Sequence, residues 1–302
     1  MTWRAKFSIG ALLGLLFSSL VVILDIWLLK LLLDWGIRAR QINILTFLLA
    51  LIVLLSIPVL LVLIYQTVSC LTLRYHLDRN RVAIRWAGNE WQIPIRDIQQ
   101  ILPGSQLGDA IVRRRGLRWP GHERGVGSVP GLGRTRFFAT RPLSEQLLLV
   151  TPGWSFGISP RDAEGFVQAF QARRELGPNR LLGQEFHPAS WSTWRLWTDQ
   201  TAWALVGAAV AINLMLFGYL CARFPNLDAQ LPLHFNSLGQ VDRIGTKMEL
   251  FALPIIGLLI LGVNIFLGLV LYKRERAGSY LLWGSAATVQ ALFWLATFSI
   301  VL

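Results

Sequence analysis

Long apolar runs alternate with polar stretches along this chain. The runs cover about residues 7–35, 44–67, 202–222, 250–272 and 280–301. A run of roughly 18 or more apolar residues is long enough to cross a bilayer as a helix. We therefore predict five membrane spans. Gly10 and Gly14 of the first run have the GxxxG spacing that lets helices approach closely.

The stretch between the second and third runs has the shorter periodicity of strands and turns. TLRYHLDRNRVAIRW alternates around Asp78-Arg79-Asn80, as in a β-hairpin. Four later segments predict further strands; they read NEWQIPIRDIQQI, RTRFFAT, EQLLLV and WSFGI. The stretch then ends in a predicted amphipathic helix, which buries Phe166 and Phe170 and has Ser159 as its N-cap.

Residues 112–136 are rich in glycine and arginine and predict a long loop between strands. GVGSVPGLG within it lacks the spacing of a phosphate-binding glycine loop. Three consecutive cations in this segment are candidate contacts for anionic lipid headgroups, with a solvated basic patch as the alternative. They are Arg113, Arg114 and Arg115.

Together these patterns predict a multi-pass α-helical membrane protein with five spans and an inserted small β-rich domain that is capped by its C-terminal helix. Residues 1–70 form a two-helix membrane anchor, and residues 71–186 form the β-rich domain. Residues 187–302 form a three-helix membrane domain with a polar outer loop at 224–247.

Composition and charge support membrane insertion. Only 15% of the 302 residues are charged, against about 25% in a typical soluble domain. The net charge of +12 fits cationic loops at the inner face of a membrane, so no nucleic acid partner is expected. Cys70 and Cys221 have no metal-ligand spacing and are expected to be buried thiols. We expect no metal and no cofactor.

Charge also predicts the topology, because lysine and arginine accumulate on the cytoplasmic side of membrane proteins. With the N-terminus in the cytoplasm, the inner side has more cations near span ends than the outer side. This places the β-rich domain in the cytoplasm and the loop 224–247 on the outer side of the membrane. Three tryptophans precede the third span at helical spacing and are predicted interfacial anchors on one helix; they are Trp191, Trp194 and Trp197.

The outer loop contains the stretch LPLHFNSLGQVDRIGTK, which is unusually polar for a link between membrane helices. Its candidate residues for ligand binding or for ordering the loop are His234, Asn236, Gly239, Asp242 and Lys247. A lone histidine is more often a structural hydrogen bonder than a metal ligand. A self-ordered lid and a ligand or peptide site therefore both stay open.

The β-rich segment resembles bacterial pleckstrin-homology-like (PH) domains attached to membrane helices. The similar features are the Tyr75-x-Leu77 hairpin, the exit IPIRDI at 93–98 and the helix entry ISPRD at 158–162. The resemblance implies a seven-stranded, partly open barrel capped by a helix, which acts as a binding or assembly module.

The outer loop resembles an uncharacterised bacterial membrane family with the signature Pro-x-His-Phe/Trp-Asn, Gly-x-x-Asp and Lys before a span. The matching stretches are PLHFN at 232–236, GQVD at 239–242 and Lys247. This family includes the toxin-immunity protein of the sporulation-delaying system. Ile244 stands near the position where the family commonly has an aromatic residue.

The leading hypothesis is a non-enzymatic protein of the bacterial inner membrane that couples the cytoplasmic module to the outer loop in envelope sensing, assembly or immunity. Its expected partners are membrane lipids and other membrane or envelope proteins. The alternative is a transporter or channel-like component, because polar residues occur in or near the spans. They are Asp25, Asn213, Asn264 and Gln290. An intramembrane enzyme comes third, since it needs paired catalytic groups that the sequence does not offer.

Overall fold

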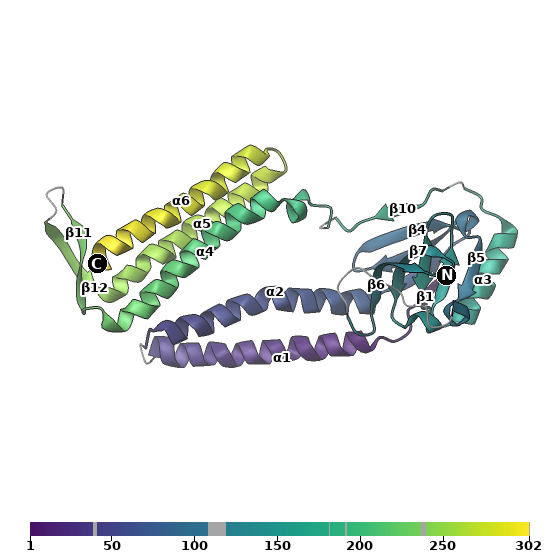
Figure 1. The fold of residues 1–302 in the computed structure, drawn as a ribbon, viewed down its shortest axis with the longest axis horizontal. Coiled ribbons are helices and arrows are strands. Elements are labelled where there is room, and N and C mark those ends of the chain that lie inside the picture. Colours follow the sequence, from purple (N-terminus) through teal and green to yellow (C-terminus); the bar gives the residue numbers. More distant parts are fainter. Residues whose placement is uncertain (39–40, 108–118, 181, 191, 237–239, 302) are drawn as a thin grey trace. The chain divides into compact units, whose positions relative to one another are not determined.

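The computed structural model describes residues 1–38, 41–107, 119–180, 182–190, 192–236 and 240–301 (Figure 1). The chain forms two compact units. One contains Met1–Ile23 and Ser56–Trp194, and the other contains Leu24–Leu55 and Arg195–Leu302.

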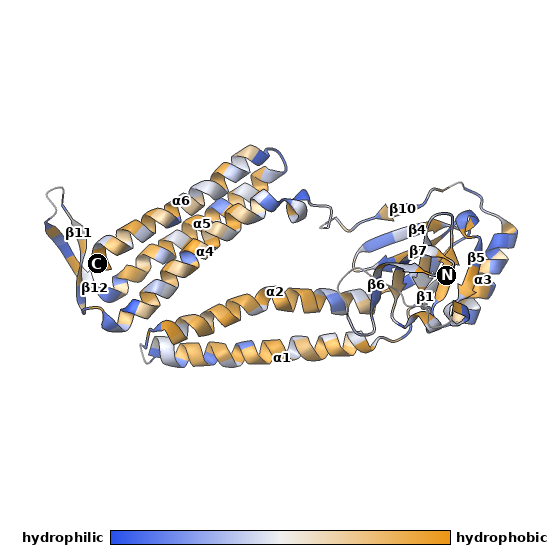
Figure 2. Ribbon diagram, viewed as in Figure 1, coloured by the Kyte–Doolittle hydropathy of each residue, from blue (hydrophilic) through white to orange (hydrophobic). Residues whose placement is uncertain are grey.

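Within the described residues, five helices are long and apolar enough to cross a membrane, which confirms the predicted number of spans. Figure 2 shows apolar residues along their whole lengths. Such surfaces are stable only when lipid covers them, because water would have to solvate a continuous apolar wall. The helices are α1 (Ile9–Leu32), α2 (Ile44–Thr72), α4 (Gln200–Arg223), α5 (Ala252–Tyr272) and α6 (Arg276–Val301).

The β-rich domain is built from two five-stranded sheets. The first has the order β1-β2-β3-β4-β10, with every neighbouring pair antiparallel. Its strands are β1 (Thr2–Arg4), β2 (Arg74–Leu77), β3 (Arg81–Trp86), β4 (Asn89–Pro94) and β10 (Glu185–His187). The predicted turn at Asp78 is confirmed: its carboxylate accepts the N–H of Asn80 at 2.6 Å and that of Arg81 at 2.9 Å.

The second sheet has the order β5-β8-β9-β7-β6, in which β7 and β9 run parallel. Its strands are β5 (Gln100–Pro103), β6 (Glu123–Val129), β7 (Gly133–Ala139), β8 (Leu147–Val150) and β9 (Ser155–Ile158). Helix α3 (Ala163–Leu176) covers the core and buries Phe166 and Phe170, as predicted. The core therefore lies between the sheets and this helix.

Three details of this domain differ from the sequence-based expectations. The predicted loop at 112–136 is wrong for its second half, which forms the β6–β7 hairpin; residues 108–118 lie outside the described part. Ser159 does not cap α3, because Asp162 is the N-cap and accepts the N–H of Gly165 at 2.9 Å. The described part of 71–186 has the strands β2 to β9, more than the seven that the resemblance implies, and β1 and β10 extend the first sheet further.

In the second unit α6 packs along both α4 and α5. Glycine and alanine make these contacts close: Ala209 and Ala286 are fully buried, and a Cβ at Gly268 would lie 2.2 Å from the Trp283 indole nitrogen. Small residues at helix interfaces are typical of membrane bundles. The link between α4 and α5 is an antiparallel hairpin of β11 (Gln230–Phe235) and β12 (Val241–Thr246).

Candidate functional site

The predicted outer loop is an ordered β-hairpin. The Asn236 carboxamide closes its tip, because its Oδ1 accepts the Gln240 N–H at 2.9 Å and its Nδ2 donates to Gln240 Oε1 at 3.3 Å. The backbone of His234 lies in β11 opposite Arg243. Gly239 lies outside the described residues. The polar residues of the tip thus fold the loop on itself.

Lys247 fastens the base of the hairpin to the end of α4. Its ammonium group donates to the carbonyl oxygens of Phe224 and Leu227, both at 3.1 Å, and lies 4.6 Å from the centre of the Phe224 ring. A lysine that binds last-turn carbonyls also compensates the negative end of the helix dipole. These contacts give Lys247 a role in ordering the loop.

The start of the following span is held by a capping box. The Glu249 carboxylate accepts the Thr246 N–H at 2.9 Å and an Arg243 guanidinium hydrogen bond at 2.9 Å. Two apolar side chains of the hairpin are exposed beside its polar ones: Val241 is 48% and Ile244 is 65% exposed. Exposed branched side chains on an ordered, otherwise polar hairpin are typical of a protein-binding surface.

The segment predicted as one helix with Trp191, Trp194 and Trp197 contains, in its described part, a single turn of 3-10 helix. Trp191 lies outside the described residues, Trp194 precedes the 3-10 helix Arg195–Thr198, and α4 begins only at Gln200. Trp197 stacks on Trp203, with ring centres 6.1 Å apart, and both are about half exposed. Their role as interfacial anchors stays a prediction. The predicted lipid contacts Arg113, Arg114 and Arg115 also lie outside the described residues.

Of the polar residues proposed to line a path through the membrane, Asn213 and Gln290 form a pair. The Asn213 amide donates to Gln290 Oε1 at 2.8 Å and to the Pro254 carbonyl at 3.0 Å, and Gln290 donates to the Gly257 carbonyl at 2.8 Å. Asn264 bonds back to its own helix at Ile260. The buried pair joins α4, α5 and α6 by hydrogen bonds. This contact pattern favours a role in helix packing over a polar path through the membrane.

At the opposite end of the bundle one aspartate and two tyrosines form a cluster that the sequence analysis did not predict. Asp199 caps α4 by accepting the Ala202 N–H at 3.0 Å, and its other oxygen accepts the hydroxyls of Tyr272 and Tyr280, both at 2.5 Å. These tyrosine hydrogen bonds are the main reason that the pKa of Asp199 falls to about 2. Asp199 therefore ties the N-terminus of α4 to α5 and α6.

Replacing Asp199 by alanine is expected to lower the melting temperature of the helical bundle. Because the pKa of Asp199 is depressed in the folded protein, its stabilising effect is present above pH 4 and is lost as the pH falls toward 2. Thermal unfolding of the full chain in detergent, followed between pH 2 and 7, measures both effects. Asp228→Asn is the control, because it removes an exposed carboxylate away from the two tyrosines; equal pH profiles of Asp199→Ala and wild type would contradict this role.

A second cluster, which the sequence also did not reveal, attaches the β-rich domain to the membrane helices; we call it the junction. The Ser8 hydroxyl donates to the Gly121 carbonyl at 2.5 Å, and the Trp119 indole donates to the Gly10 carbonyl at 2.9 Å. On α2, Tyr65 accepts a hydrogen bond from Arg124 at 2.6 Å. The ends of both helices are thus fixed to the domain by side chains.

Among the described residues, no group of three or more histidine, cysteine, aspartate or glutamate side chains is placed to hold a metal ion. Cys70 and Cys221 are buried free thiols. The polar clusters of Lys247, of Asp199 and of the junction are instead structural contacts at the ends of helices.

These observations define a class: a multi-pass membrane protein with a β-rich domain inserted between its second and third spans. Residues 73–174 match the family model of the bacterial PH domain, and residues 211–258 match a domain of unknown function (DUF1648). The chain therefore contains both domains, which confirms the two resemblances. No curated protein and no solved structure matches the chain.

Proposed function

We propose that this protein is a non-enzymatic component of the bacterial cytoplasmic membrane that binds another envelope protein through the β11–β12 hairpin, with its PH domain serving as a cytoplasmic binding or assembly module. The roles that this arrangement fits are envelope sensing, assembly or immunity. The PH domain precedes α4 in the chain and the β11–β12 hairpin follows it. With α4 crossing the bilayer once, the PH domain and the hairpin lie on opposite sides.

The observation that carries this proposal is the apolar surface of the hairpin. The Asn236 and Lys247 side chains are engaged in hydrogen bonds that order the loop, whereas Val241 and Ile244 are exposed. A preformed hairpin loses little conformational entropy on binding, so more of the contact energy at Val241 and Ile244 is retained as affinity.

Site-directed labelling tests the orientation. In a chain whose native cysteines are replaced by alanine, Ile244→Cys and Ser144→Cys place single thiols on the hairpin and on the PH domain. Ser144 is exposed. A membrane-impermeant maleimide is expected to label Ile244→Cys in intact spheroplasts and Ser144→Cys only after lysis. Labelling of Ser144→Cys before lysis would reverse the proposed topology.

Photocrosslinking in cells tests the partner. A benzophenone amino acid at position 244 is expected to give a discrete protein adduct, identified by mass spectrometry. The same amino acid at Met215, which is 57% exposed on α4, is the control and is expected to react with lipid. Lipid adducts alone at position 244 would show that the hairpin rests on the membrane, and would overturn the proposed protein interface.

A further inference from the structure

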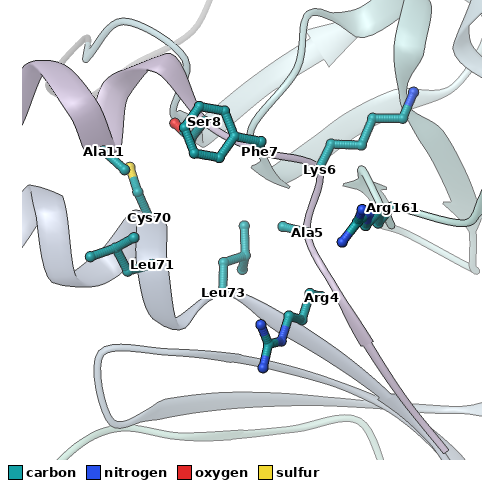
Figure 3. A pocket seen from close by; sticks show the side chains of 10 residues that line it. All are labelled: Arg4, Ala5, Lys6, Phe7, Ser8, Ala11, Cys70, Leu71, Leu73 and Arg161. Atoms are coloured by element: carbon teal, nitrogen blue, oxygen red, sulfur yellow. The ribbon is translucent and has the colours of Figure 1, made fainter.

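A pocket of about 390 Å³ opens where the PH domain meets the ends of α1 and α2, within the first unit. Figure 3 shows its lining: Arg161 lies on one side, Cys70 and Leu71 of α2 lie on the opposite side, and Arg4 and Phe7 lie between them. The pocket exists because the backbone crosses from β1 into α1 here. The Ala5 N–H donates to the Leu73 carbonyl at 3.3 Å and so fixes the crossing segment beside the residue that follows α2.

The polar half of the pocket carries uncompensated positive charge. Arg4 and Arg161 are exposed, and neither side chain forms a hydrogen bond or ion pair with any residue that the structure describes. Their positions are fixed, because the Arg161 N–H donates to the Arg4 carbonyl at 2.9 Å. Lys6 also lines the pocket, but its ammonium group pairs with Glu145 at 3.3 Å. Two arginines therefore remain available for an anion.

The first sheet extends this charge. Arg4 of β1 lies directly opposite Arg74 of β2, and Arg74 lies opposite Arg85 of β3. Like charges directly opposite one another destabilise a sheet. Arg85 is relieved by an ion pair with Glu90 at 2.5 Å, whereas Arg74 has no such pair among the described residues. A bound anion beside Arg4 would relieve the remaining repulsion.

The other half of the pocket is apolar and continuous with two membrane spans. Phe7 is 61% and Leu71 is 57% exposed, and Ala11 and Cys70 form the wall between them. Ile9 begins α1 and Thr72 ends α2, so the pocket lies at the level where the spans leave the hydrocarbon. The N-terminus of α1 adds a partial positive charge at the same level.

We infer that this pocket binds an anionic phospholipid, whose headgroup phosphate lies against Arg4 and Arg161 and whose acyl chains follow Phe7 and Leu71 down the spans. The arginine guanidinium suits phosphate oxygens in geometry and charge. Basic residues next to spans attract anionic lipid in the same way. This inference goes beyond the proposed function and does not depend on the hairpin or on its partner.

Lipid titration of the full chain tests the inference. The protein is purified in detergent and titrated with phosphatidylglycerol or with phosphatidylcholine of the same chain length, and bound lipid is counted by native mass spectrometry. We expect one phosphatidylglycerol to bind at least about ten times more tightly than phosphatidylcholine. Arg4→Gln and Arg161→Gln are each expected to weaken it about fivefold, and the double variant about twentyfold.

Matched variants make the result specific. Arg161→Lys retains the charge and is expected to retain most of the binding. Arg180→Gln removes an exposed arginine that does not line the pocket, and is expected to change nothing. Equal binding of the two lipids, or full binding by the double variant, would overturn the inference. So would arginine-dependent binding of soluble glycerol 3-phosphate without preference for phosphatidylglycerol, because the ligand would then be a free phosphate.

Discussion

Gly10→Val is expected to detach the PH domain from the first membrane helix. A Cβ at Gly10 would lie 2.0 Å from the Pro120 carbonyl oxygen and 2.8 Å from the Trp119 ring. The Pro120 carbonyl belongs to the backbone, and the Trp119 ring is held by its hydrogen bond to the Gly10 carbonyl, so the junction has to open to admit the new side chain. Overpacking of this kind costs about 1–3 kcal/mol, and the loss of the Trp119 hydrogen bond to Gly10 places this variant at the upper end.

Limited trypsin digestion of the detergent-solubilised chain measures the opening. Lys6 lies in the segment that the junction holds, and its backbone N–H and carbonyl bond to Ser159 and Thr140. About 3 kcal/mol corresponds to roughly a hundredfold more open form, so cleavage at Lys6 is expected to accelerate by about that factor. Gly262→Val on α5 is the control, because nothing lies within 4 Å of a Cβ there. Equal cleavage rates in both variants would mean that the junction does not hold the domain.

Tyr75→Phe is expected to destabilise the PH domain by about 2 kcal/mol. The Tyr75 side chain is fully buried, and its hydroxyl donates to the Phe138 carbonyl at 2.7 Å and accepts the Ser159 N–H at 3.0 Å. Removing the hydroxyl leaves both backbone groups buried without that partner. We expect the melting temperature to fall by about 10 °C. Tyr219→Phe on α4 is the control, because no described residue hydrogen-bonds the Tyr219 hydroxyl; an equal fall there would contradict the prediction.

The same hydroxyl predicts an alkaline transition. Burial raises the pKa of Tyr75 to about 12, and its hydrogen bonds with Ser159 oppose only part of that shift. Because the pKa is higher in the folded state, the folded protein holds its proton longer, and the free energy of unfolding falls as the pH rises from 10 to 12. The loss approaches about 3 kcal/mol. Urea unfolding at pH 8, 10 and 11.5 measures it, and Tyr75→Phe should show a flatter dependence; parallel slopes would contradict this assignment.

The sequence was sufficient for the parts of the fold that depend on local pattern. The spans follow from run length, and the Asp78 turn and the buried face of α3 follow from short-range periodicity. Strand β7 was predicted from RTRFFAT, whereas β6 and its pairing with β7 were missed because glycine and proline in GVGSVPGLG suggest a loop. In the structure several of these glycines are strand residues, and Gly131 and Gly133 adopt the positive φ that the turn requires.

The candidate sites were harder to predict because they join residues that are distant in the chain. Asp199 meets Tyr272 and Tyr280 only when three helices have packed. Ser159 is a residue type that often caps helices, and it lies just before α3. Its hydroxyl instead accepts the Thr140 N–H, and its backbone N–H donates to the Tyr75 hydroxyl. Pairings of this kind depend on tertiary register, which no local pattern specifies.

Strand β1 has a consequence for biogenesis. It precedes α1, whereas its partner β2 follows α2, so the first sheet contains chain from both sides of a two-span hairpin. During translation β1 emerges first but has no partner until both spans have left the ribosome. Insertion of the helical hairpin by the translocation machinery therefore comes before completion of the sheet, and a failure to insert either span leaves the domain without its edge strand.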